Sequence, residues 1–177
     1  MELEIIPAGD AEYEIVRNLA RFYLYDMAEH AQFPFDIDGN MDVGDQFNPY
    51  WGRLRPNDTR PWPSDWKGYP FLARLDGHPA GFALVNDQAT LIDMGEFFVA
   101  RQYRRHRIGQ RFVTAMFDKF PGSWEVRQMM TNVGAQKFWN RIIGEYTNGR
   151  FTETTERFAR YSNNEFVVQR FVSGGGR

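Results

Sequence analysis

The sequence contains no cysteine, and this absence excludes disulfide bonds, thiolate metal sites and a cysteine nucleophile. It also has no apolar run of about 18 residues, the length that a membrane-spanning helix needs. Its first residues, MELEIIPAGD, carry acids where a secretory signal carries bases before an apolar stretch. We therefore expect a cytoplasmic protein that does not associate with a membrane.

A large net charge is missing as well. The formal charge is −2 at pH 7, which argues against a general nucleic-acid binder. The charges are unevenly distributed, because acids outnumber bases in residues 1–60 and bases outnumber acids in residues 61–177. The sequence thus predicts an anionic and a cationic region that meet different ligands.

Aromatic side chains, by contrast, are abundant. They make up 16% of the 177 residues, and hydrophobic residues make up 42%, which is typical of one globular domain with a substantial core. We expect that domain to span residues 1–172, and residues 173–177, SGGGR, to form a flexible tail. The aromatic surplus leaves room for a homodimer interface.

Hydrophobic periodicity divides the chain into strands and helices. It predicts strands at 2–6, 69–75, 80–85, 90–99, 124–131, 151–161 and 165–172, and helices at 10–30, 107–120 and 132–144. This order indicates an α+β fold with a mixed, mostly antiparallel central sheet flanked by helices and with one strand–helix–strand crossover. Gly95, inside the strand at 90–99, predicts a bulge or a close approach to the backbone.

A cluster of arginines stands where a predicted strand gives way to a helix. Its members are Arg101, Arg104, Arg105, Arg107 and Arg111. A helix that begins near Arg107 offers unsatisfied amides and the positive end of its dipole to an anion, and Gly109 lets a ligand approach the backbone. On spacing alone, a solvated helix start is an equal alternative, although cations there oppose the dipole.

This segment resembles a known cofactor motif. EFFVARQYRRHRIGQRFV (96–113) is similar to the [Q/R]-x-x-G-x-[G/A] motif of the GNAT superfamily of N-acetyltransferases. Arg104 matches the first position and Gly109 the last, whereas Arg107 replaces the middle glycine. A second segment, TNVGAQKFWNRIIG (131–144), is similar to the family motif N-x-x-A-x-x-F-Y. The resemblance implies the GNAT fold, with acetyl-CoA bound where the central strands splay apart.

The same resemblance implies where the cofactor binds. The residues implied for its pyrophosphate are Arg104, Arg105, Arg107, Ile108, Gly109 and Gln110, and those for its pantetheine arm are Phe98, Val99, Asn132 and Phe138. Family chemistry implies direct attack of an amine on the thioester, without a covalent enzyme intermediate.

A carboxylate on the central strand is the general base that the resemblance implies, and the candidates are Glu96 and, secondarily, Asp93. The family's usual acid, a tyrosine, is replaced by Trp139, so either Tyr146, Tyr50 or water protonates the leaving thiolate, or the thiolate leaves unprotonated. Structural alternatives remain: a salt bridge for Glu96, and core packing for Trp139 and Tyr146.

Residues 32–67 lack periodicity and form a long loop where the family shapes its acceptor site. The loop alternates carboxylates (Asp36, Asp38, Asp42, Asp45) with aromatic residues (Phe33, Phe35, Phe47, Tyr50, Trp51, Trp62, Trp66). This composition suits a cationic amine, although rings that simply pack on the sheet are an equal alternative. No glutamate closes the calcium-like DIDGN stretch in register, so no metal site is expected.

The resemblance therefore implies an acetyl-CoA-dependent N-acetyltransferase acting on a small-molecule or peptide amine. A non-catalytic acyl-CoA-binding module is the alternative, because the tyrosine and one glycine are replaced. A nucleic-acid binder that uses the arginines is a third reading, and it would show steeply salt-dependent affinity.

Overall fold

The computed structural model of the chain describes residues 2–32, 34–53, 65–158 and 164–174. Its strands are β1 (Leu3–Pro7), β2 (Lys67–Leu75), β3 (His78–Asp87), β4 (Ile92–Val99), β5 (Gly122–Met129), β6 (Thr152–Arg157) and β7 (Glu165–Ser173). The helices are α1 (Tyr13–Ala31), α2 (Ile108–Lys119) and α3 (Val133–Thr147), with 3-10 turns at Asp10–Glu12, Asn48–Trp51 and Arg101–Tyr103. The predicted element order is confirmed.

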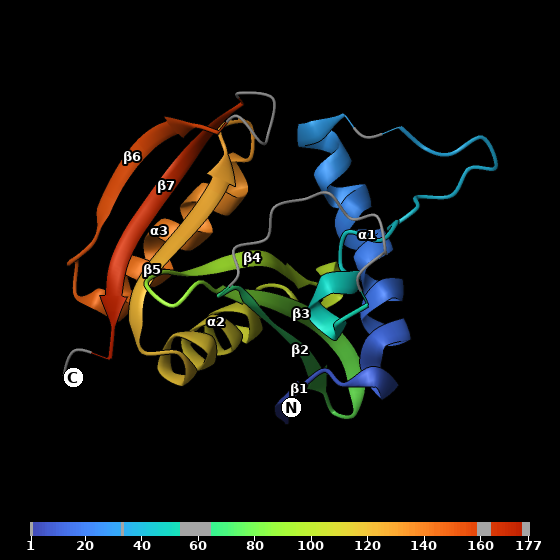
Figure 1. Cartoon of the computed structure of the whole chain (residues 1–177), viewed down its shortest axis with the longest axis horizontal. Coiled ribbons are helices and arrows are strands. Elements are labelled where there is room, and N and C mark those ends of the chain that lie inside the picture. Colours follow the sequence, from blue (N-terminus) through green and yellow to red (C-terminus); the bar gives the residue numbers. More distant parts are fainter. Residues whose placement is uncertain (1, 33, 54–64, 159–163, 175–177) are drawn as a thin grey trace.

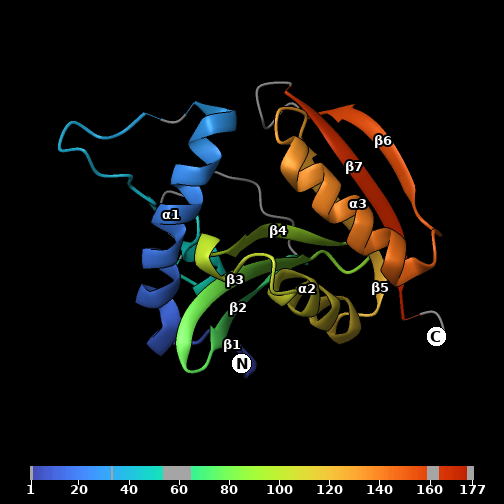
Figure 2. The ribbon, with the colours of Figure 1, turned by 180° about the vertical axis from the view of Figure 1, so that it is seen from behind.

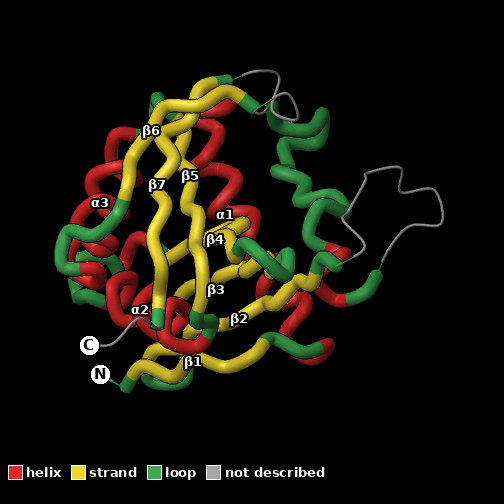
Figure 3. Tube along the Cα trace, turned by 60° about the vertical axis from the view of Figure 1, so that its left-hand side comes forward, coloured by secondary structure: helices red, strands yellow, loops and turns green. Residues whose placement is uncertain are grey.

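The strands form one seven-stranded sheet in the order β1-β2-β3-β4-β5-β7-β6. Neighbouring strands are antiparallel except β4 and β5, which are parallel and joined by α2 as the predicted crossover. Figure 1 shows β1 to β4 below and β5 to β7 rising beside them. Figure 3 shows β6, β7 and β5 side by side. The mixed, mostly antiparallel α+β fold is confirmed.

Helices cover both faces of the sheet. Val16, Ala20 and Leu24 recur every four residues along α1 and pack with Leu72, Phe82, Leu84 and Phe98 on one face. Helices α2 and α3 pack on the other face through Phe112, Met116, Phe117, Ile142 and Ile143. Figure 2 shows α2 and α3 from the side that they cover. The central strands are therefore buried on both faces.

The sheet is split at its centre. β4 and β5 pair only at Ile92–Trp124 and Asp93–Glu125, and beyond these residues the two strands diverge. Helix α1 stands beside one half of the sheet and α3 beside the other. The divergence leaves room between the halves for the site described below.

Gly95 forms the predicted bulge. Leu84 of β3 pairs with Glu96, but its neighbour Val85 pairs with Met94, so Gly95 is the additional residue on β4. The additional residue shifts the alternation of side chains by one position beyond the bulge. Consequently Asp93 and Glu96, three residues apart, face the same side of the sheet.

Two predicted boundaries were wrong. Helix α3 does not stop at Gly144 but continues to Thr147, where Asn148 caps it in the left-handed conformation (φ 53°). Ser173, expected in the tail, ends β7 and is buried, and its Oγ donates to the Phe120 carbonyl at 2.9 Å. The ordered domain thus extends past residue 172, and residues 175–177 lie outside the described part.

Candidate active site

Two adjoining cavities occupy the split between the strands. The Glu96 cavity, about 550 Å³, is lined by Glu96, Met94, Arg127, Met129, Gln46 and Asn164 among others. The arginine cavity, about 690 Å³, is lined by Arg101, Arg104, Arg105, Arg107, Gly109 and Arg141 among others. Tyr23, Met27, Phe97, Asn132, Ala135 and Trp139 line both. The cavities are therefore two halves of one cleft.

The arginine cavity contains the start of α2. The N-cap is Arg107, whose side chain accepts no bond from the first turn, so the amides of Ile108, Gly109 and Gln110 remain available to an anion. Arg107 adopts the left-handed conformation (φ 58°), as does Arg105 (φ 69°). A glycine would hold this backbone without strain, which explains why the family motif has glycine where this chain has Arg107.

Two arginines of the cluster are anchored to α1. Asp26 accepts from Arg101 Nη2 at 2.7 Å and from Arg104 Nη2 at 2.5 Å. Arg104 Nε also donates to the Val99 carbonyl at 2.8 Å. In the described part of the chain, Arg105 and Arg107 have no ion-pair partner. These two guanidinium groups are thus the ones that can turn to a ligand phosphate without breaking a bond.

Other expected cofactor residues also reach the cleft. Gly109 lies against the Phe138 ring, since a Cβ there would come within 3.0 Å of it. Gln110 lines the arginine cavity, but its side-chain Nε2 donates to Glu145 of α3 at 2.7 Å. Phe98 and Val99 line the same cavity, and the Arg104 bond already occupies the Val99 carbonyl. A cofactor arm that pairs with that carbonyl would share it with Arg104 or displace the Arg104 bond.

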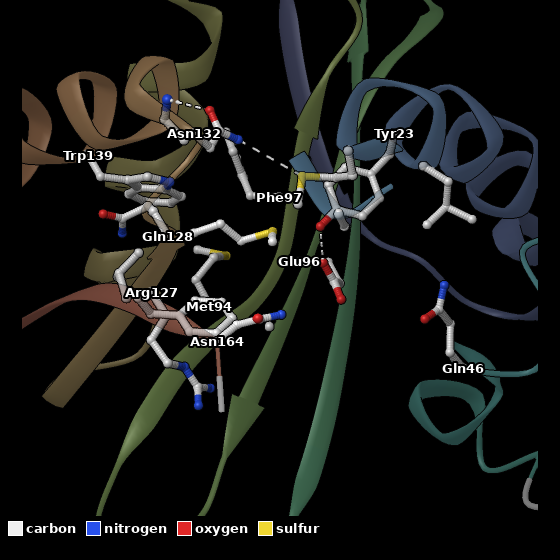
Figure 4. Close-up of a pocket in the computed structure, with 18 residues that line it drawn as sticks. Tyr23, Gln46, Met94, Glu96, Phe97, Arg127, Gln128, Asn132, Trp139 and Asn164 are labelled. Carbon is white, nitrogen blue, oxygen red and sulfur yellow. Dashed lines mark hydrogen bonds between the residues drawn. The ribbon is translucent and has the colours of Figure 1, made fainter. Parts of the chain in front are cut away.

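Asn132 is the predicted N-cap of α3, and this prediction is confirmed. Its Oδ1 accepts from the Ala135 amide at 2.9 Å, whereas its Nδ2 lies 4.0 Å from the Met27 sulfur across the cleft. Figure 4 shows both contacts. The capping bond fixes the side chain, so Nδ2 is the atom that it can offer to a ligand.

Glu96 faces the cleft from the β4 wall. Its Oε2 accepts a hydrogen bond from the Tyr23 hydroxyl of α1. Arg127 lies on the opposite, β5 wall, as Figure 4 shows. Asp93 is buried, with 2% of its surface exposed, and Arg127 Nη2 lies 3.3 Å from its Oδ1. The structure thus places both candidate carboxylates on one face of β4, but of the two only Glu96 lines the cleft.

The pKa values of both acids are raised by their surroundings. Burial raises the pKa of Glu96 to about 7, the neighbouring Asp93 charge adds to the rise, and the Tyr23 hydrogen bond and Arg127 oppose it. Burial also raises the pKa of Asp93, against Arg127 and hydrogen bonds from Asn86 and Gln88. A carboxyl that titrates near neutrality is suited to general base catalysis.

The match of the whole chain to known proteins agrees with this geometry. The sequence matches the model of the acetyltransferase (GNAT) family over residues 26–144, more than half of its length. The chain belongs to this family. None of the curated proteins matches the sequence significantly. Membership in the GNAT family confirms the expected class, a transferase that uses acetyl-CoA.

Solved structures share the GNAT fold. The ribosomal-protein-S18-alanine N-acetyltransferase of Escherichia coli is 15% identical with a TM-score of 0.58, over 99% of this chain and 97% of that chain. Ard1 of Thermoplasma volcanium is 12% identical with a TM-score of 0.58, over 98% and 99% of the two chains. The protein yncA of Salmonella typhimurium, solved with its cofactor acetyl-CoA, is 9% identical with a TM-score of 0.60, over 99% and 96%. At these identities the likeness concerns the fold.

Tyr146 is not part of the cleft of this GNAT protein. Its hydroxyl donates to Asp118 of α2 at 2.9 Å, and its ring packs on Phe117. It lines neither cavity, so the expectation that Tyr146 supplies the catalytic proton is corrected. Trp139 is 6% exposed and packs edge-on against Phe97, which is the core packing expected for it, although one side also lines both cavities.

Tyr23 is a cleft residue that the sequence did not point to. It belongs to the inner stripe of α1, lines both cavities and donates to Glu96. In the sequence it reads as one more aromatic residue on a hydrophobic helix face. Only the contact with a carboxylate 73 residues away distinguishes it from core packing.

The long loop of this GNAT protein mostly packs on the sheet. Phe47 is buried against Phe82, and Trp51 donates to the Gly9 carbonyl at 3.0 Å.

The loop carboxylates do not line the Glu96 cavity, and three of them accept hydrogen bonds from nearby residues: Asp38 from Asn40, Asp42 from Gly44 and Asp45 from Asn48. Gln46 is the described loop residue that reaches that cavity. Phe33 and Trp62 lie outside the described residues, and the expected acidic, aromatic amine site is not formed by the others.

The described residues contain no group of three or more His, Cys, Asp or Glu side chains placed to hold a metal ion. None of the helices in the described part of the chain is long and apolar enough to cross a membrane.

Proposed function

We propose that this GNAT protein transfers the acetyl group of acetyl-CoA to a primary amine by direct attack, with Glu96 as the general base. The observation that carries the proposal is the position of Glu96 in the wall of the Glu96 cavity, hydrogen-bonded to Tyr23, which lines both cavities, and with its pKa raised by burial to about 7. The acceptor is a small molecule or a peptide N-terminus in the Glu96 cavity, and the reaction takes place in the cytoplasm.

The arginine cavity fits the diphosphate of the cofactor. It combines unpaired amides at the start of a 12-residue helix with the free side chains of Arg105 and Arg107. Fixed donors and nearby cations bind phosphate groups well. When bound, acetyl-CoA supplies the thioester whose carbonyl carbon the amine attacks.

Glu96 takes the proton that the amine must lose. An alkylamine is mostly protonated at neutral pH, so the base has to remove a proton before the nitrogen lone pair is free to react. Because the pKa of Glu96 lies at about 7, its carboxylate is both present and basic under these conditions.

Tyr23 completes the proton transfer. Its hydroxyl lies where the two cavities meet and is hydrogen-bonded to Glu96. It can donate its proton to the departing sulfur and recover one from Glu96, which took the first amine proton. Glu96, ionised again, then accepts the second proton that the nitrogen loses as the amide forms. This role replaces the one expected of Tyr146.

A non-catalytic acyl-CoA-binding module is the second candidate. Trp139 favours it, because an indole replaces the family's tyrosine and does not transfer protons. Under this reading the cleft binds the cofactor but releases no free thiol in the presence of amines.

Turnover measurement separates the two. Purified protein is mixed with acetyl-CoA and a broad panel of primary amines, free thiol is followed over time, and calorimetry measures CoA binding in parallel. Thiol release that is lost in Glu96→Gln, with CoA affinity kept, supports the transferase. Glu14→Gln, at an exposed acid in the first turn of α1, is the matched control. Tight CoA binding without thiol release for any amine establishes the binding module instead.

A further inference from the structure

Asn86 connects the long loop to the buried acids. It lies in β3, is 8% exposed, and pairs across the strands with Asp93. Its Oδ1 accepts from the Tyr50 hydroxyl at 2.6 Å and from Trp66 Nε1 at 3.1 Å, and its Nδ2 donates to Asp93 Oδ1 at 2.7 Å. One side-chain amide thus touches the loop at one end and the acid pair at the other.

The orientation of this amide is fixed by the chemistry of its partners. The Trp66 indole can only donate, so it requires an oxygen, and an ionised Asp93 can only accept, so it requires the NH₂ group. A flipped amide would face donor with donor and acceptor with acceptor. The loop therefore holds Asn86 in the one orientation that presents a donor to Asp93.

The bulge at Gly95 leaves the space for this junction. A Cβ at Gly95 would lie 2.5 Å from the Tyr50 hydroxyl and 2.7 Å from Asn86 Nδ2. The same residue that turns Asp93 and Glu96 to one face therefore lets Tyr50 reach Asn86 directly above them. The long loop and the Asn86 amide therefore both contact β4 at Gly95.

We propose that Asn86 is a positioning residue that ties the loop residues Tyr50 and Trp66 to the ionisation of the Asp93–Glu96 pair. This rests on the proposed function, because it assigns Glu96 the base role. Asn86 acts through Asp93: its donated hydrogen bond favours the charged form of Asp93, and that charge opposes ionisation of Glu96. The other groups facing the pair are Gln88, Arg127 and Glu125 at Asp93 and Tyr23 at Glu96; Glu125 pairs with Asp93 across the strands, and its Oε1 lies 3.5 Å from Arg127 Nε.

Two substitutions at Asn86 shift the pair in opposite directions. Asn86→Leu removes the donor, so Asp93 holds its proton longer and no longer opposes Glu96. Asn86→Asp keeps acceptors for Tyr50 and Trp66 but adds another carboxylate next to Asp93, which holds more protons in the cluster. We expect the acid limb of the kcat/KM profile to move down by about half a pH unit or more for Asn86→Leu and up by a similar amount for Asn86→Asp.

Trp51→Phe is the control for loosening the loop at a point that does not involve Asn86. Trp51 anchors the same loop by a hydrogen bond to the Gly9 carbonyl and not through Asn86, so this variant should leave the acid limb in place. Tyr50→Phe, which weakens the hold on Asn86, should move the limb in the direction of Asn86→Leu. Equal acid limbs in wild type, Asn86→Leu and Asn86→Asp, with only the rate reduced, would overturn the proposal.

The failure of this inference is distinguishable from failure of the proposed function. Carboxyl ¹³C shifts of labelled aspartate and glutamate report both titrations in the resting protein, without turnover. Opposite shifts of the Glu96 titration in the two Asn86 variants support the junction even if no amine is acetylated. Unmoved titrations in folded Asn86→Asp, which is isosteric with the wild type, refute it even if the enzyme is active.

Discussion

Asp93 and Glu96 lie on one face of β4 although three residues separate them, because Gly95 inserts an additional residue into the strand. A regular strand would direct them to opposite faces. The bulge instead sets two carboxyl groups in one electrostatic environment, where burial and the Asp93 charge raise the pKa of Glu96 to about 7. The first prediction follows from this relationship.

Asp93→Asn should lower the pKa of Glu96. The substitution removes a negative charge that opposes the ionisation of Glu96. It also ends the ion pair of Arg127 with Asp93, so that the Arg127 charge is less neutralised and stabilises ionised Glu96 more. The acid limb of kcat/KM should therefore move to lower pH. Asp87→Asn, in the same hairpin but bonded to the Ala89 amide, is the control. A limb that stays or moves up in Asp93→Asn contradicts the assignment.

Glu96→Gln should stabilise the fold at alkaline pH. Burial raises the pKa of Glu96 from 4.5 to about 7, so between these values the folded protein holds a proton that the unfolded chain has lost. The stability of the wild type therefore falls as pH rises through this window, by on the order of 3 kcal/mol at most. Urea unfolding at about pH 5 and about pH 8 should show the advantage of the variant only at the higher pH.

Gly95→Ala should be destabilising by about 1–3 kcal/mol. The added Cβ would lie 2.5 Å from the Tyr50 hydroxyl and 3.1 Å from the Leu84 carbonyl, so either the junction or the bulge must shift. Gly144→Ala is a suitable comparison, since it lies inside α3 with its nearest atom 3.7 Å away, and it should gain up to about 1 kcal/mol. Equal denaturation midpoints for the two variants would refute this account of the bulge.

Arg107→Gly should stabilise the protein by about 0.5–1 kcal/mol. The left-handed backbone of Arg107 (φ 58°) costs about 1–2 kcal/mol for a residue with a side chain. Glycine removes this cost, but it also increases the conformational entropy of the unfolded chain, which offsets part of the gain. Arg107→Ala keeps the strain and removes the charge, so it reports the charge alone. Thermal melts in which alanine matches glycine would show that strain is not the cause.

Gly109→Glu should weaken CoA binding at least about tenfold, because it adds an anion where the arginine cavity offers helix amides to phosphate. The Cβ alone would crowd Phe138 at 3.0 Å, and Gly109→Ala isolates this steric part. Calorimetry with CoA should rank wild type above alanine and alanine above glutamate. Unchanged affinity in the glutamate variant would remove the helix start from the cofactor site.

The element order was predictable because strand and helix periods are local properties of the sequence. The bulge was predictable for the same reason, since a glycine interrupts a strand. Residues of the cofactor motif line the arginine cavity, and Glu96 and Asp93 lie in the strand where they were expected. These features depend on neighbours within a few residues.

The remaining features depend on contacts between distant segments. Tyr146 follows Trp139 by seven residues, about 10 Å along a helix, and that rise carries it from the cleft to the Asp118 side of α2. Arg104 lines the arginine cavity as expected of a cofactor residue, but its ion pair with Asp26 of α1 could not be predicted, because Asp26 lies 78 residues away. Tyr23 carries no local signal, because its polar partner comes from a strand far along the chain.

The early end of β4–β5 pairing, after Asp93 and Glu125, also affects self-association. Unpaired strand edges ordinarily invite other chains to add to a sheet. Here the two edges face each other across the cleft, with α1 beside one half of the sheet and α3 beside the other. The unpaired backbone groups are therefore turned toward the cleft rather than toward the outer edges of the sheet, which are β1 and β6.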